Sequence, residues 1–509
     1  MTLSATNFIV KQYLKTRQKR IQRLIEEPHL CQTNTFQEIL NTQKNTLWGE
    51  QYNLDSIKHP ENFRTRIPIH TYEDIYTWVD KMVMGQADIL HPGIVSAYAR
   101  SSGTSNDRSK YIPLAQKMLK DGHDTASWDL LSTIYHHLPD TKIFVHKNLI
   151  MAGSVHRFKN NTDAIYGDIS AITLNNLPPF SRPYYTPDFE TALLDDWEEK
   201  IDRMVKACSK EEVTMLAGVP SWTLILLQKI LAYKRLETME QVWPEARVFI
   251  HGGVGFEPYR RSFDALFPSG NLAYMEVYNA SEGFFAFQND LDSDDLLLLL
   301  DHGVYYEFIP ASEFDKDQPR TFTLKEVELG ETYALVISTY SGLCRYRLGD
   351  TITFTSLEPY KIKVTGREQQ YINAFGEELM VQNAESALAK TGEKHQAIIT
   401  EYTVAPQYME MTKQGRHQWL IEFEKEPASL QQFALDLDKE LQSINSDYEA
   451  KRSYDLVMKQ LLITPLPQGS FFKWMQLKGK LGGQNKVPRL SNNRNIIEQL
   501  LKTINKTNV

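Results

Sequence analysis

Cysteine is scarce in this chain, and its placement excludes two classes of protein. The 509 residues include only three cysteines, Cys31, Cys208 and Cys344. No pair has the CxxC spacing of zinc ribbons and thiol–disulfide enzymes, and a small secreted disulfide scaffold needs more cysteines. The chain is therefore not a disulfide-stabilised domain, and its cysteine content fits a reducing compartment.

Long apolar runs are also missing. The longest is Leu296 to Leu300, far shorter than the ~20 residues that span a bilayer, and we expect it to form a buried strand. Residues 7–23 mix Lys and Arg with apolar residues, so they lack the continuous apolar core of a signal peptide. We therefore expect a soluble, cytoplasmic protein that has no membrane partner.

An excess of positive charge is absent as well. Lys and Arg number 56 against 64 Asp and Glu, which gives a formal net charge of -8. Proteins that bind nucleic acids present a basic face to the phosphates, so we expect no nucleic-acid partner. A local basic channel for a small anionic ligand remains compatible with this charge.

The order of apolar and turn residues predicts an α/β fold. Strand-like and helix-like segments alternate along the chain, which favours sheets packed between helices. The expected elements are an amphipathic helix within residues 7–25, a helix starting at Thr71, strands at 214–217, 248–250 and 333–338, a helix at 222–233 capped by Ser221, and a helix at 432–444.

The length predicts more than one domain. A chain of 509 residues exceeds what one hydrophobic core usually serves. The clearest boundary lies near Lys363 to Arg367, after which the helix and strand patterns start afresh. We therefore expect a large N-terminal domain over residues 1–363 that binds the ligands and a smaller C-terminal domain over residues 364–509.

A short loop rich in small hydroxyl residues, SSGTSNDRSK at 101–110, has the composition of a phosphate site. Glycine and small residues allow several backbone N–H groups to point one way, hydroxyls add donors, and a lysine adds a charge. The loop is not a Walker motif, because Arg108 stands where the second glycine is required. Taken alone, it fits a surface turn as well. The candidate residues are Ser101, Ser102, Gly103, Thr104, Ser105 and Lys110.

Three further segments supply complementary groups. The HGGV segment that ends in Val254 follows an expected strand, and its two glycines let a ligand approach the backbone. The YNASEG segment combines the ring of Tyr278, the hydroxyl of Ser281 and the carboxylate of Glu282. The RYRLGD segment ends in the carboxylate of Asp350. Together with the loop, these groups form a set suited to binding ATP and Mg²⁺.

Each of these residues also has a purely structural interpretation. Tyr278 has apolar neighbours and could be a core aromatic. Asp350 follows a glycine, as turn residues often do. Arg345 and Arg347 alternate and would then face solvent from a strand. His251 is expected to be a packed residue at a strand end rather than a catalytic base.

The segments SSGTSNDRSKYIP, YNASEGFF and YRLGD resemble, in this order, the nucleotide motifs of the Gretchen Hagen family of acyl acid–amido synthetases. That family belongs to the superfamily of acyl-CoA synthetases, peptide-synthetase adenylation domains and luciferases. The resemblance continues through RTRIPIHTYEDI, GVPSW, VTGREQQYINAFGEEL and GGQNKVPRL, so it spans nearly the whole chain. One departure is Asn106-Asp107, which stands where the superfamily loop usually has a second glycine. Asn and Asp tolerate left-handed backbone better than other non-glycine residues.

The resemblance implies an adenylate-forming fold with a mobile C-terminal domain, and a reaction in two steps. ATP first activates a carboxylic acid as an acyl-adenylate with release of pyrophosphate. An amino acid then attacks the acyl carbon, which gives an amide and AMP. Coenzyme A as the acceptor, and a non-catalytic ATP-binding protein, remain the alternatives. The oligomeric state and the identity of both substrates stay open.

The resemblance also implies a role for each candidate residue. Lys486 would be the mobile lysine of the adenylation step, with Lys473, Lys478 and Lys480 as rivals. The acyl acid would lie near Val219 and Trp222. The other assignments are Ser101, Ser102, Gly103, Thr104, Ser105 and Lys110 to the triphosphate, Gly252, Gly253, Val254 and Tyr278 to adenine, Ser281 to the α-phosphate, Glu282 to Mg²⁺, Asp350 to the ribose, and Arg367 to the hinge.

Overall fold

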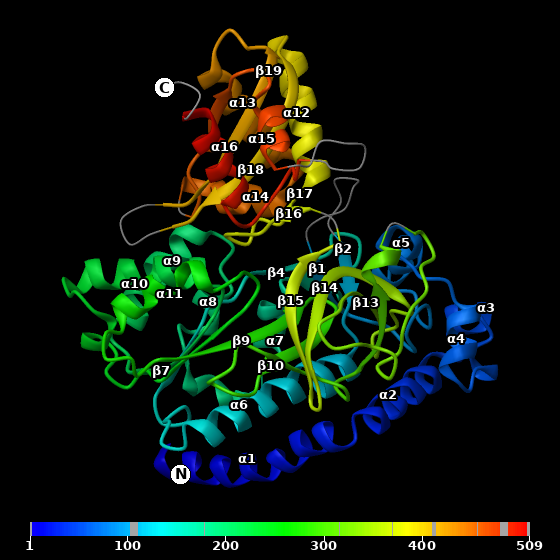
Figure 1. The fold of residues 1–509 in the computed structure, drawn as a ribbon. Coiled ribbons are helices and arrows are strands. Elements are labelled where there is room, and N and C mark those ends of the chain that lie inside the picture. Colours follow the sequence, from blue (N-terminus) through cyan, green and yellow to red (C-terminus); the bar gives the residue numbers. More distant parts are fainter. Residues whose placement is uncertain are drawn as a thin grey trace.

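The structure is a computed structural model that describes residues 3–101, 110–177, 179–314, 316–368, 370–409, 414–455, 457–478 and 487–505. It confirms the α/β class, because a large mixed sheet lies among helices and a smaller sheet with its own helices forms the C-terminal part (Figure 1). In the described ranges, no helix has the length and apolar character that crossing a membrane requires.

The central sheet has eleven strands in the order β12-β13-β14-β15-β11-β10-β9-β8-β7-β3-β6. The half from β9 to β6 is parallel and the half from β12 to β9 is antiparallel. The strands are β3 (Lys147–Ile150), β6 (Tyr185–Thr186), β7 (Val213–Ala217), β8 (Val248–His251), β9 (Ala273–Ala280), β10 (Gly283–Gln288), β11 (Leu296–Leu298), β12 (Val304–Pro310), β13 (Thr332–Thr339), β14 (Tyr346–Leu357) and β15 (Tyr360–Arg367).

A second sheet carries the ends of the expected phosphate loop. Its order is β2-β1-β5-β4. In the antiparallel pair of β1 and β2, Ser101 lies opposite Lys110, so residues 102–109 connect two adjacent strand ends. The strands are β1 (Ala97–Ser101), β2 (Lys110–Pro113), β4 (Val155–Arg157) and β5 (Ile165–Gly167).

The helices of the N-terminal part cover the sheets. The long helices α1, α2 and α6 run along one side of the molecule, as their blue and cyan ribbons show (Figure 1). The capping box expected at Thr71 and Asp74 is present. The helices are α1 (Leu3–Glu26), α2 (Pro28–Gln43), α3 (Leu47–Gln51), α4 (Pro60–Arg66), α5 (Tyr72–Val83), α6 (Thr125–His137), α7 (Ile169–Asn175), α8 (Phe189–Ala192), α9 (Trp197–Cys208), α10 (Pro220–Lys234) and α11 (Glu257–Leu266).

Two expectations from the sequence are wrong. Ser221 does not cap its helix, because the N-cap is Val219, and the Ser221 hydroxyl donates instead to the carbonyl of Phe375 at 3.2 Å. Arg345 does not face solvent; it is buried and pairs through Nε with Glu307 at 3.0 Å. Both errors arise because the partner lies far away in sequence and only the tertiary fold brings it near.

The C-terminal part is built on a three-stranded sheet, β18 (Ile398–Gln407), β19 (Arg416–Lys425) and β20 (Leu462–Leu466), and a strand pair, β16 (Tyr371–Ile372) and β17 (Leu379–Met380). In Figure 1 it stands apart from the large sheet, in yellow to red. The division at residues 363 and 364 remains a proposal, and β15 continues past it to Arg367. Its helices are α12 (Val381–His395), α13 (Leu430–Ile444), α14 (Ser446–Arg452), α15 (Ser470–Leu477) and α16 (Asn495–Asn505).

Candidate functional site

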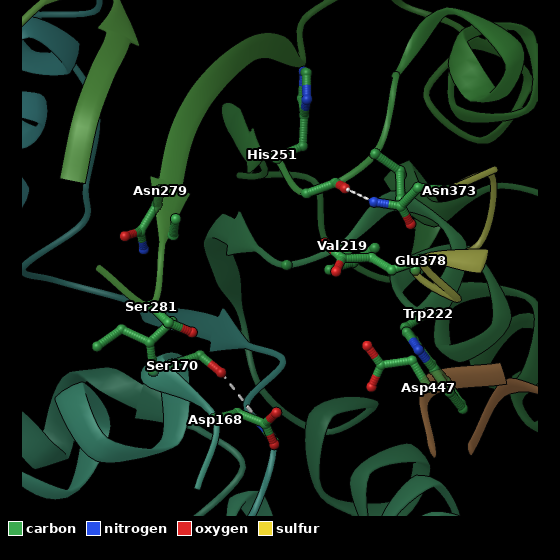
Figure 2. Close-up of a pocket in the computed structure, with 18 of the residues that line it drawn as sticks. Asp168, Ser170, Val219, Trp222, His251, Asn279, Ser281, Asn373, Glu378 and Asp447 are labelled. Atoms are coloured by element: carbon green, nitrogen blue, oxygen red, sulfur yellow. Dashed lines mark hydrogen bonds between the residues drawn. The ribbon is translucent and has the colours of Figure 1, made fainter. Parts of the chain in front are cut away.

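A cleft of about 1570 Å³ lies between the parallel half of the central sheet and the C-terminal part. We call this the central cleft. Figure 2 shows Asn279 and Ser281 on one side of it and Trp222 and Asp447 on the other. The carboxyl ends of parallel strands commonly form ligand sites in α/β proteins. The lining includes, from the sequence candidates, Ser101, Lys110, Val219, Trp222, Gly252, Gly253, Val254, Tyr278, Ser281, Glu282, Asp350 and Arg367.

Two glycines follow β8 where it lies against β9. A side chain at Gly252 would collide with the carbonyl oxygen of Val277 on β9. Gly253 has a φ of +80°, in the left-handed region that favours glycine. Its carbonyl accepts a 2.9 Å hydrogen bond from Nδ2 of Asn373. The strand end therefore exposes backbone to the cleft and is tied to the segment that begins the C-terminal part.

A chain of polar contacts joins Tyr278 to the C-terminal part. The Tyr278 hydroxyl donates to Oδ2 of Asp350 at 2.6 Å, and Nε of Arg367 lies 3.0 Å from the other oxygen of Asp350. Nη2 of Arg367 lies 3.1 Å from Glu378. Asp350 and Arg367 are also opposite each other in the β14–β15 register. Three residues from distant segments are thus fixed as one unit.

The structural interpretations of two of these residues are only partly right. Tyr278 is 9% exposed, and its ring centroid lies 5.0 Å from that of Phe285, as in a core aromatic. Its hydroxyl, however, donates to the carboxylate of Asp350, which lines the cleft. Asp350 lies within β14 rather than in a turn. Burial raises the pKa of Asp350, and the cation of Arg367 opposes that rise.

Glu282 is a buried acid in the two-residue turn between β9 and β10. Burial raises its pKa to about 7, with Lys110 lowering and Asp350 raising it. Within the described ranges Glu282 makes no ion pair within 4.0 Å and no group of three or more potential metal-binding side chains occurs. A buried carboxylate without a cation fits a single protein ligand for Mg²⁺, which commonly takes one or two carboxylates alongside substrate phosphates and water.

His251 is a packed residue at the end of β8, as expected. It is 4% exposed, and its ring stacks on Phe256 at 4.1 Å. Burial lowers its pKa to about 3. A histidine held neutral and covered in this way serves packing.

Several sequence candidates cannot be placed in this site. Of the rivals to Lys486, Lys473 lies on α15 and Lys478 follows that helix, and neither lines the cleft. The candidates Ser102, Gly103, Thr104, Ser105, Lys480 and Lys486, together with Asn106 and Asp107, lie outside the described residues.

The sequence analysis missed an aromatic pair and a buried lysine beside the cleft. Trp197 stacks on Trp222 with ring centroids 4.0 Å apart. Lys200 is 1% exposed, and its Nζ donates to the carbonyls of Ala152 and Gly153, each at 3.0 Å. Nothing local marks Lys200, since a lysine on an amphipathic helix usually faces solvent. The motif GVPSW did point to Trp222.

Comparisons with known proteins show which family this chain belongs to. The chain matches the GH3 family N-terminal domain over residues 17–272, the GH3 family central domain over residues 297–367 and the GH3 family C-terminal domain over residues 382–495. A probable indole-3-acetic acid-amido synthetase, GH3.1 of Arabidopsis thaliana, is 22% identical and aligns with 94% of this chain and 92% of its own length.

Other similar proteins are named for related activities. The 4-substituted benzoates-glutamate ligase GH3.12 of Arabidopsis thaliana is 22% identical over 93% of this chain and 95% of its own. The GH3.15 acyl acid amido synthetase structure has a TM-score of 0.61 at 17% identity and covers 97% of this chain and 96% of its own. A 2-hydroxyisobutyryl-CoA ligase has a TM-score of 0.55 at 11% identity, with coverages of 96% and 92%. The structural likenesses show a shared fold, and the domain matches show that this chain belongs to the GH3 family.

Proposed function

We propose that this protein is an ATP-dependent ligase that adenylates a carboxylic acid and transfers the acyl group to an amino acid. The observation that carries the proposal is the Tyr278–Asp350–Arg367 unit beside the Gly252–Gly253 strand end. It offers a carboxylate for ribose hydroxyls next to exposed backbone for a base. The family membership and the acid–amino acid ligases among the relatives support the same reaction.

Each residue around the nucleotide then has a role. Asp350 binds the ribose hydroxyls, and Tyr278 holds that carboxylate while its ring borders the adenine with Val254. Ser281 binds near the α-phosphate. The triphosphate lies against the β1–β2 connection, where Lys110 supplies a charge from the first position of β2. Ser101, Ser102, Gly103, Thr104 and Ser105 supply the remaining donors.

Glu282 would hold Mg²⁺, which when bound would neutralise part of the charge on the phosphates. Besides Mg²⁺, the protein itself would supply a second positive charge, which we assign to Lys486. When the acid's carboxylate attacks the α-phosphate, negative charge grows on the nonbridging oxygens and on the leaving pyrophosphate. Lys486, placed there, would stabilise the transition state more than the ground state. Loss of one such donor typically costs on the order of 3 kcal/mol, or about a hundredfold in rate.

The second step needs an amine and a leaving group. The amine nitrogen forms the C–N bond, the bond from the acyl carbon to the AMP oxygen breaks with its electron pair, and the nitrogen loses one proton. For both steps to use one cleft, we propose that the domain of residues 364–509 rotates about Arg367. Scattering profiles with an ATP analogue and with AMP plus product should then differ, and identical profiles would contradict the rotation.

The acid's own body is expected to be apolar. The part of the cleft near Val219 is lined by Met151, Ala217 and Ile250 and by the Trp197–Trp222 stack. Apolar walls of this kind select aromatic or aliphatic acids.

Pyrophosphate release from ATP with Mg²⁺ tests the function. A panel of aromatic and aliphatic acids is assayed alone, with amino acids and with coenzyme A. We expect release that depends on one class of acid, and an amide mass only when an amino acid is present. A thioester without amide would assign coenzyme A as the acceptor, and ATP binding without any acid-dependent release would indicate a non-catalytic relative. Lys110→Ala should lower the rate about a hundredfold, with the exposed Lys120→Ala as the matched control.

A further inference from the structure

Helix α14 brings a cation from the C-terminal part to the central cleft. Lys451 lines the cleft, and its Nζ lies 5.5 Å from the ring centroid of Trp222. In the part of the chain that the structure describes, the Lys451 ammonium has no carboxylate within 4.0 Å and no hydrogen-bond partner, although the Lys451 backbone carbonyl accepts from the N–H of Met458 at 3.1 Å. Several carboxylates line this cleft, yet the Lys451 ammonium pairs with none of those described. It is therefore available to bind the anionic group of a ligand.

The facing element from the N-terminal part is the start of α10, which is also electropositive. Val219 is its N-cap and makes no side-chain capping hydrogen bond, so the first backbone N–H groups of a 15-residue helix are left without a capping side chain. The positive end of the helix dipole lies at the same place. Trp222, in the first turn, is 4% exposed, and its indole N–H has no hydrogen-bond partner in the described chain.

These donors do not belong to the triphosphate site. That site is assigned to Lys110 on β2, which belongs to a different sheet. Lys451 on α14 instead approaches Trp222 on α10, and Trp222 lies together with Asp447 of α14 on the side of the cleft opposite Ser281 (Figure 2). An anion bound there is a separate ligand group from ATP.

Acidic groups on the same helix and across the cleft complete the pattern. Asp447 precedes Lys451 by one helical turn, so both side chains project from one face of α14, and Asp447, Asp195 and Asp196 line the cleft as well. A lysine with carboxylates around it matches the charges of a zwitterionic ligand, which carries one negative and one positive group. A free amino acid is such a ligand, with a carboxylate for the lysine and an ammonium for the acids.

We infer that Lys451 and the start of α10 form the subsite for the α-carboxylate of the acceptor amino acid. The inference rests on the proposed function and adds to it the residues that select an amino acid over a simple amine. The subsite lies at the meeting of the two parts of the chain. The acceptor is therefore bound only when α14 stands over α10, as it does in this structure.

The test compares acceptors with and without the carboxylate. Amide formation is measured with an amino acid that the wild-type protein uses and with the carboxamide of the same amino acid. Lys451→Ala should raise the KM for the amino acid about tenfold or more, as expected for the loss of a charge-assisted contact. The KM for the carboxamide should change by less than about twofold. Lys451→Arg should restore most of the preference for the free acid, because it keeps the charge.

Two controls separate this effect from misfolding. Lys439→Ala removes an exposed lysine of α13 in the same part of the chain and should match the wild type. ATP–pyrophosphate exchange without acceptor reports the first step, in which the amino acid takes no part. An equal rise in KM for both acceptors, or no rise for either, would overturn this inference but leave the proposed function standing. Absence of any amide with the wild-type protein would overturn the proposed function and, with it, the inference.

Discussion

The hydroxyl of Tyr278 lies 2.6 Å from Oδ2 of Asp350, although 72 residues separate the two in sequence. Asp350 also pairs with Arg367 at 3.0 Å, so its carboxylate is held from two sides. Burial raises the pKa of Tyr278 well above its ordinary value, and the hydroxyl therefore stays a donor at physiological pH. The fold alone thus fixes the orientation of the Asp350 carboxylate.

Tyr278→Phe should raise the KM for ATP roughly tenfold, because a buried carboxylate loses one hydrogen bond while the ring remains. ATP-dependent pyrophosphate release at saturating acid measures this. Tyr274→Phe is the matched control, since Tyr274 lies on the same strand and donates to Asp264 at 2.7 Å but does not line the cleft. Equal effects of the two substitutions would mean that the hydrogen bond serves only the stability of β9.

Glu282 should impose a pH dependence on the adenylation step. Its pKa of about 7, raised by burial, means that its carboxylate form, which we propose to bind Mg²⁺, gains population as pH rises through 7. At low Mg²⁺ the rate should therefore increase from pH 6 to pH 8. Higher Mg²⁺ should move the midpoint to lower pH, because a bound cation favours the charged form.

Glu282→Gln tests the assignment, since it removes the titrating group and keeps the side-chain size. We expect a rate that is low and flat across the same pH range. A midpoint near pH 7 that persists in this variant would assign the titration to another group. A wild-type midpoint that does not change with the Mg²⁺ concentration would do the same.

Lys200 should make the stability of the protein depend on pH. It should also support the part of the cleft near Val219, where we propose that the carboxylic acid binds. Burial lowers its pKa to about 8, so between that pH and its ordinary value near 10.5 the unfolded chain binds more protons than the folded one. Stability should therefore increase as pH rises from 8 to 10.5, since the charged form is the one that burial penalises.

Lys200→Met should abolish that increase and raise the KM for the acid, because the carbonyls of Ala152 and Gly153 at the cleft lose their donor. Urea unfolding at several pH values and acid-dependent pyrophosphate release are the measurements. Lys206→Met, at an exposed position of the same helix α9, is the control. An unchanged KM for the acid would limit Lys200 to stability.

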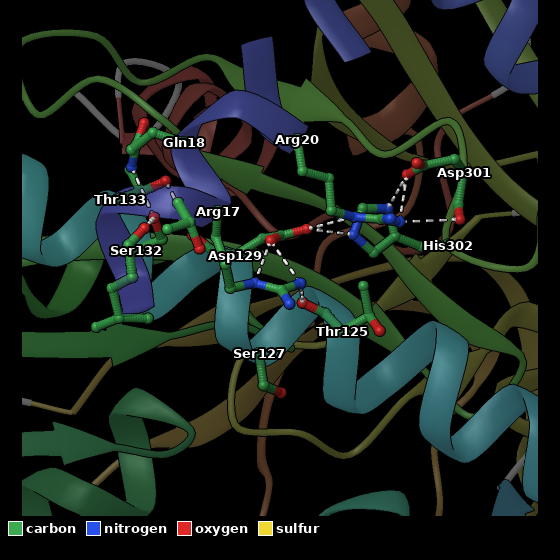
Figure 3. A network of polar contacts seen from close by, with 12 residues as sticks. Arg17, Gln18, Arg20, Thr125, Ser127, Asp129, Ser132, Thr133, Asp301 and His302 are labelled. Atoms are coloured by element: carbon green, nitrogen blue, oxygen red, sulfur yellow. Dashed lines mark hydrogen bonds and ion pairs between the residues drawn. The ribbon is translucent and has the colours of Figure 1, made fainter. Parts of the chain in front are cut away.

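A buried ionic network attaches α1 to the rest of the fold (Figure 3). Asp129 on α6 accepts from Nε of Arg17 at 2.7 Å and of Arg20 at 3.2 Å, and lies 2.9 Å from Nε2 of His302. Burial by itself lowers the pKa of His302, but the hydrogen bonds to Asp129 and Asp301 raise it above its ordinary value. The two carboxylates therefore favour the protonated form of the histidine.

Asp129→Asn should lower the free energy of unfolding by about 3–5 kcal/mol, because two arginines and the histidine beside them lose their shared anion. Urea unfolding followed by circular dichroism measures this, with the exposed Asp140→Asn as the control. In the wild type, the contribution of His302 is present at low pH and is lost as pH rises through its raised pKa. A loss below 1 kcal/mol in Asp129→Asn would show that packing alone attaches α1.

The sequence by itself determined the local features of this protein. The capping box at Thr71 and Asp74, the strand before Gly252 and the β-branched run of β13 depend on residues within one turn or one strand. The resemblance of motifs to a known family, and hence the α/β fold and the class of reaction, also follows from order along the chain. These features are readable because hydrophobic period and turn chemistry act over short distances.

Only the tertiary structure decided which distant groups meet. The partners of Asp350, the burial of Arg345 beside Glu307 and the approach of Lys451 to Trp222 depend on strand register and on how the two parts of the chain pack. Nothing in the sequence near these residues marks the contact, because each partner comes from a segment whose position is set by the whole fold. Charge and burial, and with them the chemistry of the site, are therefore properties of the packed chain.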